Sequence, residues 1–269
     1  MTKSTSGTTG YAYLDDATTP LAFAHRGGAS HPELVGLENT LTAFRHAAGL
    51  GYTYLETDVH TTRDGVLLAF HDTLLDRMTD SSGDVIEATY QEVEGALIGD
   101  REPIPTLSEL LDALPGVRFN IDLKSEAAVP LLARLIEDRQ AHDRVLVGSF
   151  KLRRLNRFRR LTRGRVPTSA SPLEVIAFRF LPSGRLADLV TRGRVAALQV
   201  PHRRGRVTVT TAGLVRRAHR AGKHVHSWTV DDAEEMIELL DRGVDGLMTD
   251  RTDILRDVLA SRGQWREQP

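Results

Sequence analysis

The chain contains no cysteine, which excludes disulfide bonds, thiolate nucleophiles and thiolate metal ligands. It also lacks any apolar run of the roughly 18–20 residues that a membrane-spanning helix needs. The charges nearly cancel, because 35 lysines and arginines face 36 acidic residues, so no overall field attracts nucleic acid or an anionic membrane. We therefore expect a soluble cytoplasmic protein without nucleic-acid partners and without stable membrane association.

Large apolar residues are scarce at the amino terminus. Residues 1–19 are rich in Thr, Ser and Gly and lack the apolar stretch of a secretory signal peptide. We expect this segment to be a flexible arm that precedes a single domain at 20–269. The length of 269 residues and the apolar fraction of 41% suit one domain of the size of a TIM barrel.

Short runs of apolar and β-branched residues alternate with longer stretches of helical periodicity, a pattern typical of βα units around a parallel sheet. Eight runs are expected to be strands: Leu21–His25, Thr53–His60, Val117–Lys124, Arg144–Ser149, Val166–Ala170, Val195–Val200, His224–Thr229 and Gly246–Thr249. Eight stretches are expected to be helices: Asn39–Leu50, Leu107–Leu114, Glu126–Ala141, Leu152–Leu161, Ser171–Phe178, Ala212–Ala221, Ala233–Leu240 and Ile254–Ser261. Eight strands, each followed by a helix, predict an α/β fold of the (β/α)8 TIM-barrel type.

One connection is too long for an ordinary loop between a strand and its helix. Residues 61–104 separate the second strand from the helix that should follow it, whereas such loops have roughly 2–6 residues. A strand-like run, Val66–His71, follows the Asp64-Gly65 turn, which indicates structure within this segment. We expect a small insertion subdomain after the second strand.

Short polar motifs succeed one another in the first third of the chain. They are His25-Arg26-Gly27-Gly28, Glu38-Asn39-Thr40, Glu56-Thr57-Asp58, Asp64-Gly65 and His71-Asp72. Their order and spacing resemble the glycerophosphodiester phosphodiesterase family of the PLC-like phosphodiesterase superfamily, whose sequences run H-R-G, E-N-T, E-x-D, D-G and H-D. The resemblance covers most of the chain and implies a subdomain inserted at the long connection.

Two carboxylates, Glu56 and Asp58, stand two residues apart on an expected strand and therefore share one face. In a TIM barrel that face is the interior, and the carboxyl end of the strand opens at the mouth of the active site. Two carboxylates in one pocket repel each other unless a cation neutralises them, and hard oxygen ligands suit Mg²⁺ or Ca²⁺. We expect one divalent cation here, against the alternative of a solvent-exposed Glu-x-Asp pair.

Asp122 and Lys124 repeat this spacing on the next expected strand. Asp122 is a predicted third metal ligand, and Lys124 is expected to hold a phosphate oxygen or to balance the acids. The related family usually has Glu-x-Lys at this place, so Asp122 is shorter by one methylene. The alternative is a buried ion pair between the two side chains.

His25 and His71 are the expected catalytic residues, because imidazole titrates near neutral pH and can act as a general acid or base. Each stands in a motif that the related family shares, which favours catalysis over a purely structural role. Arg26 adjoins His25, and its guanidinium is expected to bind the phosphate in a bidentate manner.

Three further residues are placed around the site. Asn39 is expected to begin a helix. Glu38 and Asn39 are expected to position the side chains that contact the substrate or the metal, without contacting either themselves. The related family usually has Pro before this Glu, where this chain has Leu37. Trp228 ends the seventh expected strand in a Trp-Thr-Val run that resembles a signature of the family. We expect its ring to contact the glycerol moiety, with packing in the core as the alternative.

Two other patterns are compatible with different functions. His224-Val225-His226 resembles the H-x-H pattern of zinc hydrolases, but the further ligands of such a site are not evident in the sequence. The basic run Lys151–Arg165 is compatible with binding to lipid or nucleic acid. Its apolar residues recur at helical spacing, so a solvated helix face is the favoured interpretation.

The resemblance implies metal-dependent hydrolysis of a small glycerophosphodiester to sn-glycerol 3-phosphate and an alcohol. The histidines would transfer the protons, with the hydroxyl of the glycerol as nucleophile and a cyclic phosphate that water then opens. One alternative is a lipid-directed phosphodiesterase resembling sphingomyelinase D, which the long insertion and the lack of disulfides disfavour. The other is a non-catalytic protein that binds phosphodiesters. The sequence does not indicate an oligomeric state.

Overall fold

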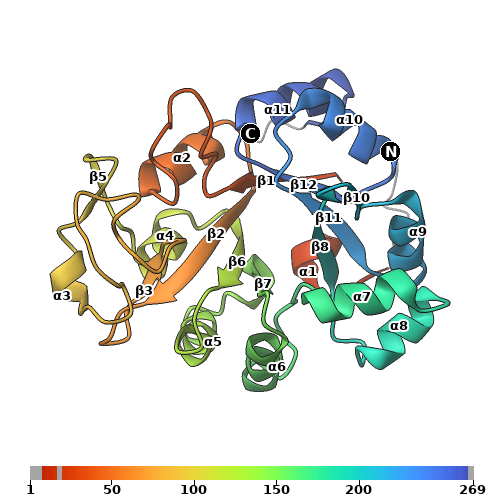
Figure 1. The fold of residues 1–269 in the computed structure, drawn as a ribbon, viewed down its shortest axis with the longest axis horizontal. Coiled ribbons are helices and arrows are strands. Elements are labelled where there is room, and N and C mark those ends of the chain that lie inside the picture. Colours follow the sequence, from red (N-terminus) through yellow and green to blue (C-terminus); the bar gives the residue numbers. More distant parts are fainter. Residues whose placement is uncertain (1–7, 17–19, 266–269) are drawn as a thin grey trace.

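The computed structural model describes residues 8–16 and 20–265. Seven parallel strands form a curled sheet in the order β7-β6-β2-β1-β12-β11-β8, and helices lie around its outside (Figure 1). The strands are β1 (Leu21–His25), β2 (Tyr54–Thr61), β6 (Arg118–Leu123), β7 (Val145–Gly148), β8 (Ala197–Pro201), β11 (His224–Trp228) and β12 (Gly246–Thr249). Each agrees with an expected strand to within two residues at either end. The α/β class with a curled parallel sheet is therefore confirmed.

The prediction of a fifth strand at Val166–Ala170 is wrong. The segment makes only isolated parallel bridges, Thr168 with Val147 of β7 and Ser169 with Ala197 of β8. Pro167 explains part of this difference, because proline has no backbone N–H to donate to a ladder. Its carbonyl still accepts a bond from the N–H of Val147, at 3.0 Å.

Helices cover the outer face of the sheet, and their apolar sides pack on it. They are α2 (Leu41–Gly49), α4 (Leu107–Ala113), α5 (Ala128–Asp138), α6 (Leu152–Leu161), α7 (Pro172–Phe180), α8 (Gly184–Val190), α9 (Ala212–Arg220), α10 (Ala233–Asp241) and α11 (Thr252–Ser261). Side chains of Ser, Thr or Asp cap the first turns of six of them: Thr40, Thr106, Ser171, Ser183, Thr211 and Asp232. The sequence predicted all but α8, a short helix in the connection that leads into β8.

Part of the expected amino-terminal arm is structured. Helix α1 (Ala12–Asp15) packs at the amino ends of the strands, where Tyr13 and Leu14 are buried with Leu21 and Phe23. The hydroxyl of Tyr54 donates a hydrogen bond of 2.7 Å to the carbonyl of Tyr13. Two large apolar side chains of α1 therefore close one end of the sheet. Residues 1–7 and 17–19 lie outside the described part of the chain.

The long connection after β2 contains β3 (Leu67–Ala69), α3 (Tyr90–Val93), β4 (Leu97–Ile98) and β5 (Glu102–Pro103). Strand β3 pairs antiparallel with β2, so it extends the sheet at the point where β2 runs past its neighbours. Eight buried residues form an apolar cluster of their own there: Leu68, Phe70, Leu75, Val85, Val93, Ala96, Ile98 and Ile104. Beyond this, β9 (Arg203–Arg204) and β10 (Val207–Thr208) form a small hairpin after β8. Residues His142–Arg144 form a 3-10 turn before β7.

Within the described residues, no helix combines the length and the apolar character needed to cross a membrane. This agrees with the lack of long apolar runs in the sequence.

His226 lies fully buried inside the sheet, with its ring 4.9 Å from that of Phe23. Its ring centroid is 5.8 Å from that of His224, which is also buried. Across the residues that the structure describes, His224 and His226 are not part of a cluster of three or more His, Cys, Asp or Glu side chains arranged as a metal site. Burial, reinforced by His224, lowers the pKa of His226 to about 3.

We expect this histidine to make the protein sensitive to mild acid. The unfolded imidazole titrates near pH 6.5, so below that pH the unfolded state binds a proton that the folded state refuses. Stability should fall as the pH drops from about 6.5 towards the folded pKa of about 3, with a loss of about 2 kcal/mol between pH 7 and 5. Denaturant unfolding of the wild type and of His226→Gln at both pH values measures the effect. An equal pH dependence in the two proteins would contradict it.

Candidate active site

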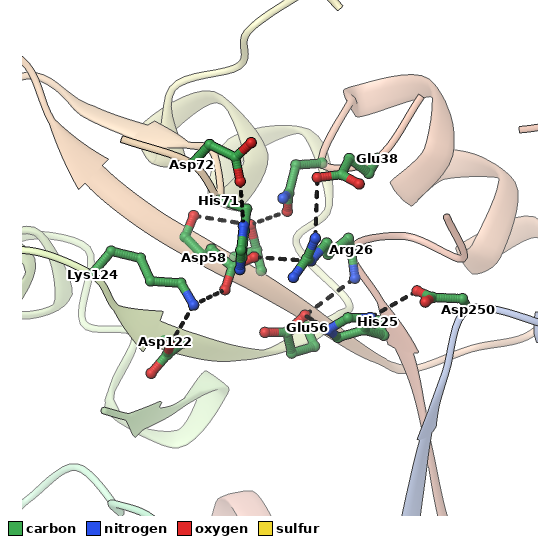
Figure 2. A network of polar contacts seen from close by, with 12 residues as sticks. His25, Arg26, Glu38, Glu56, Asp58, His71, Asp72, Asp122, Lys124 and Asp250 are labelled. Carbon is green, nitrogen blue, oxygen red and sulfur yellow. Dashed lines mark hydrogen bonds and ion pairs between the residues drawn. The ribbon is translucent and has the colours of Figure 1, made fainter. Parts of the chain in front are cut away.

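The register of the sheet brings the polar motifs together at the carboxyl ends of β1, β2 and β6. His25 pairs with Glu56 across β1 and β2, and Asp58 pairs with Asp122 across β2 and β6. Residues paired in this way in a parallel sheet project from the same face, so four predicted site residues become neighbours. Figure 2 shows them in one polar network with Arg26, Lys124, His71 and Glu38.

Glu56 and Asp58 are almost fully buried, with 5% and 2% of their surface exposed. Burial and the neighbouring charge of Asp58 raise the pKa of Glu56 to about 7. Burial also acts to raise the pKa of Asp58, but Lys124 and Arg26 outweigh it and hold that pKa below its usual value. The oxygen Oδ2 of Asp58 is buried and has no hydrogen-bond partner. Lys124 and Arg26 pair with Asp58, while Glu56 stays buried with a raised pKa, and the hard oxygens of the two carboxylates fit a divalent cation.

Lys124 lies between Asp58 and Asp122. Its Nζ is 2.9 Å from Oδ1 of Asp58 and 2.8 Å from Oδ2 of Asp122 (Figure 2). Burial lowers the pKa of Lys124, but the two carboxylates outweigh it and raise the pKa above its usual value. Asp122 therefore pairs with Lys124, and this ion pair is the alternative to metal ligation that the sequence offered for the two residues. A cluster of three ligands is not formed by the described residues.

His25 is held between two carboxylates. Its Nδ1 is 2.7 Å from Oδ1 of Asp250, and its Nε2 is 3.7 Å from Oε2 of Glu56. Burial lowers the pKa of this imidazole, but the charges of Glu56 and Asp250 outweigh burial and raise it to about 9. The bond to Asp250 fixes the ring and leaves Nε2 directed towards the carboxylates of β2.

His71 follows β3 and reaches the network from the long connection. Its Nδ1 is 2.6 Å from Oδ1 of Asp72, whose other oxygen accepts a hydrogen bond of 2.5 Å from Nε of Arg77. The bond from Arg77, followed by that from His71, lowers the pKa of Asp72 to about 2. The carbonyl of His71 lies 3.1 Å from Nε2 of His60, which holds the backbone of this residue. His25 and His71 thus each have Nδ1 bound to an aspartate.

Arg26 adopts a φ of 49°, a left-handed conformation that turns the chain out of β1 and directs the guanidinium over β2. Its Nε is 3.2 Å from Oδ2 of Asp58, and its NH1 donates to Oε1 of Glu38 at 3.2 Å. Glu38 also accepts a hydrogen bond of 2.7 Å from NH2 of Arg77. Glu38 therefore connects Arg26, which follows His25, with Arg77, which binds the aspartate that holds His71.

Asn39 does not cap α2 with its side chain; Thr40 does so by accepting a hydrogen bond from the N–H of Ala43. The side-chain oxygen of Asn39 instead accepts a bond of 2.8 Å from the hydroxyl of Thr57, between the two carboxylates of β2. Its Nδ2 is buried without a hydrogen-bond partner, so it is free to donate towards the site.

Trp228 lies at the end of β11 and is half-buried. Its ring packs edge-on against Phe150, with centroids 5.8 Å apart. It also packs against the buried cluster at the interior of the sheet. Among the described residues, no hydrogen bond or ion pair joins Trp228 to the polar network, and its aromatic partner is Phe150.

Two members of the network, Asp250 and Arg77, were absent from the residues that the sequence indicated. Asp250 directly follows β12, the eighth expected strand, and an acid at the carboxyl end of a barrel strand is a usable signal for a site residue. Arg77 lies six residues beyond His71 in an irregular segment, and no motif in the sequence indicated it.

Comparison with known proteins places the chain among enzymes. The model of the glycerophosphoryl diester phosphodiesterase family matches residues 25–254. The Mycobacterium tuberculosis protein named "Probable glycerophosphodiester phosphodiesterase 2" is 44% identical over 248 residues, which cover 91% of this chain and 92% of that protein. A glycerophosphodiester phosphodiesterase of Bacillus altitudinis is 30% identical, over 86% of this chain and 94% of that protein.

A solved structure has the same fold. It is that of an Oleispira antarctica phosphodiesterase in complex with the product sn-glycerol-3-phosphate. It superposes with a TM-score of 0.75 and 22% identity, covering 90% of this chain and 97% of that one. The chain therefore belongs to the glycerophosphoryl diester phosphodiesterase family.

Proposed function

We propose that this enzyme hydrolyses small glycerophosphodiesters to sn-glycerol 3-phosphate and an alcohol with the help of one divalent cation, Mg²⁺ or Ca²⁺. The observation that carries this proposal is the pair of aspartate-bound histidines, His25 and His71. They lie around buried carboxylates and the side chains of Arg26 and Lys124. The product found with the Oleispira antarctica phosphodiesterase supports the same bond being broken here.

Glu56 and Asp58 would hold the cation, and Asp122 would complete the carboxylate set. The burial of both carboxylates and the raised pKa of Glu56 support this assignment. When bound, the cation supplies charge that stabilises the phosphoryl oxygens in the transition state. Lys124 pairs with both aspartates, so its ammonium lies beside the proposed metal ligands, where it could bind a phosphate oxygen.

The proton transfers belong to the two histidines. With Nδ1 of each imidazole bound to an aspartate, Nε2 is the nitrogen left to exchange a proton with substrate. One histidine removes the proton from the attacking hydroxyl of the glycerol, and the other gives a proton to the departing alkoxide. Water then opens the cyclic phosphate, and the two histidines exchange their roles as acid and base in this step. Arg26 and Lys124 balance the negative charge of the phosphoryl group.

We also propose that the barrel is closed by residues 166–170 and that residues 61–104 form a subdomain inserted into a domain of 20–269. The isolated bridges of Thr168 and Ser169 to the two edge strands support closure. The separate apolar cluster of the long connection supports the subdomain. A cytoplasmic location stays a prediction from the cysteine-free sequence.

Asp250 acts in this scheme as a positioning residue that holds His25. We expect Asp250→Asn to lower kcat on the order of 100-fold while KM changes little, because the neutral amide no longer fixes the tautomer of the imidazole. Asp250→Glu should restore part of the rate. Asp257→Asn, an acid of α11 with a well-exposed side chain, is the matched control. A higher KM with an unchanged kcat in Asp250→Asn would refute the assignment. An equal decrease in kcat in Asp250→Asn and Asp257→Asn would refute it as well.

The substrate class is tested by comparing glycerophosphocholine with a choline lysophospholipid. The proposal expects release of sn-glycerol 3-phosphate and choline from the first, with a much larger kcat/KM than for the lipid. Preference for the lysophospholipid would favour the lipid-directed alternative. Tight binding of glycerophosphocholine without any product from a folded, metal-supplied protein would favour a binding role.

A further inference from the structure

Positive charge is concentrated in one segment of this nearly neutral chain. Residues 151–194 contain twelve of the 35 lysines and arginines but only two of the 36 acids. The segment therefore carries a net charge of +10, which leaves −11 for the rest of the chain. It comprises α6, α7, α8 and the loops that join them, which lie away from α2 and α3 in Figure 1.

The two acids of this segment are already engaged. Glu174 is buried and pairs with Arg159 at 2.6 Å, and Asp188 pairs with Lys223 of the following unit at 2.9 Å. The remaining cations are largely exposed. Seven of them are exposed and pair with no carboxylate among the described residues: Lys151, Arg153, Arg160, Arg163, Arg185, Arg192 and Arg194.

Large apolar side chains are exposed beside these cations. They occupy the outward side of α7 and α8 and are between 38% and 74% exposed: Leu173, Ile176, Phe180, Leu186, Leu189 and Val190. On α7 they recur at helical spacing, while Phe178 on the opposite side is fully buried. The helices pack on each other, so their exposed residues form one surface, which we call the α7–α8 surface. An apolar surface of this kind on a soluble domain usually marks an interaction site.

Two adjoining hollows combine both kinds of side chain. The first, a cavity of about 370 Å³, lies between α6 and α7 and includes Leu173, Val190 and Arg192 in its lining. The second, of about 290 Å³, is lined by Arg160 and Arg163 among others. Both include Arg194, so an apolar groove continues into a hollow rich in arginine. An apolar groove next to an arginine-rich hollow suits an amphiphile that has an apolar tail and an anionic head group.

We propose that the α7–α8 surface, together with the exposed arginines of α6, docks reversibly on an anionic lipid bilayer. The apolar side chains enter the boundary between head groups and acyl chains, and the arginines pair with lipid phosphates. Nucleic acid would match the charge but would leave the aliphatic side chains without partners. A symmetric contact between two copies would bury the apolar residues but place one +10 segment against another.

The proposal goes beyond the hydrolytic function and does not depend on it. It also departs from the sequence-based expectation of no membrane association, which considered the basic run of α6 alone. The exposed side of α7 and α8 supplies the apolar component that α6 lacks.

Cosedimentation with vesicles tests the proposal on the full chain. We expect binding to phosphatidylglycerol vesicles at least about tenfold stronger than to phosphatidylcholine vesicles, and a loss of most of it at roughly 0.5 M salt. Equal binding to both vesicles, or no binding to either, would overturn the proposal. Concentration-dependent dimers in sedimentation without vesicle binding would indicate self-association instead, and salt-sensitive retention on DNA alone would indicate nucleic acid.

Variants separate the two components of the surface. The double substitution Phe180→Ser with Leu189→Ser should weaken vesicle binding on the order of tenfold, and so should Arg160→Gln with Arg192→Gln. The matched controls are Val35→Ser and Arg45→Gln, exposed residues near and on α2, which should leave binding unchanged. All variants should hydrolyse soluble substrate normally, which verifies folding. Equal effects of the test and control variants would contradict the assignment.

Discussion

Replacing His71 with alanine is expected to lower kcat about 1,000-fold or more while the fold stays intact. The imidazole is one of two proton-transfer groups in the proposed reaction, and a positioned general acid or base contributes roughly 10²- to 10⁴-fold. About a third of the side chain is exposed, so its removal creates no buried cavity. Steady-state kinetics on glycerophosphocholine measures the rate, and circular dichroism with thermal unfolding measures the fold.

His142→Ala is the matched control for this experiment. That imidazole also pairs with a carboxylate, Glu137, but on the surface between α5 and β7. It should keep the wild-type rate. A His71→Ala protein that turns over glycerophosphocholine within a few-fold of the wild type would remove His71 from the mechanism.

Glu56→Gln is expected to abolish activation by metal without unfolding the protein. The carboxylate is buried beside Asp58, which repels it, so a neutral amide of the same shape should preserve the fold and can still accept the bond from the N–H of Arg26. Loss of one charged ligand should weaken metal binding at least about tenfold and lower kcat by about 100-fold or more. Isothermal calorimetry with Mg²⁺ or Ca²⁺ measures the affinity.

Thermal unfolding gives an independent measurement of the same site. A ligand that binds only the folded state raises the melting temperature, so added metal should stabilise the wild type and leave Glu56→Gln unchanged. Glu126→Gln is the control, since this acid lies two residues beyond Lys124 and pairs with Arg154 at the surface. Equal stabilisation of the wild type and Glu56→Gln by metal would show that the cation binds elsewhere.

Periodicity was sufficient to predict most elements of the fold. The seven strands are nearly continuous buried runs, and such runs are visible in the sequence because parallel strands are covered on both sides. The segment 166–170 is buried like the strands, but Pro167 has no N–H to donate to a ladder, and the segment makes isolated bridges only. Helix α1 was missed because four residues carry no periodicity, although Tyr13 and Leu14 are among the most buried side chains.

The site was predictable where its residues stand in short motifs. Glu56, Asp58 and His25 follow from their places at the ends of β1 and β2, and the register then brings Asp122 beside them. Pairings over long distances left no local signal. Asp250 contacts His25 across 225 residues, and Arg77 reaches Glu38 across 39. Such contacts depend on the closure of the fold and could not be read from spacing.

Release of sn-glycerol 3-phosphate from glycerophosphocholine by the metal-stripped protein, before and after addition of Mg²⁺ or Ca²⁺, tests the central claim most directly. The account predicts little release without metal and full turnover once either cation is restored, with choline as the second product. It also predicts that Glu56→Gln gives no such recovery. Turnover that is unaffected by stripping, or products other than sn-glycerol 3-phosphate and choline, would contradict it.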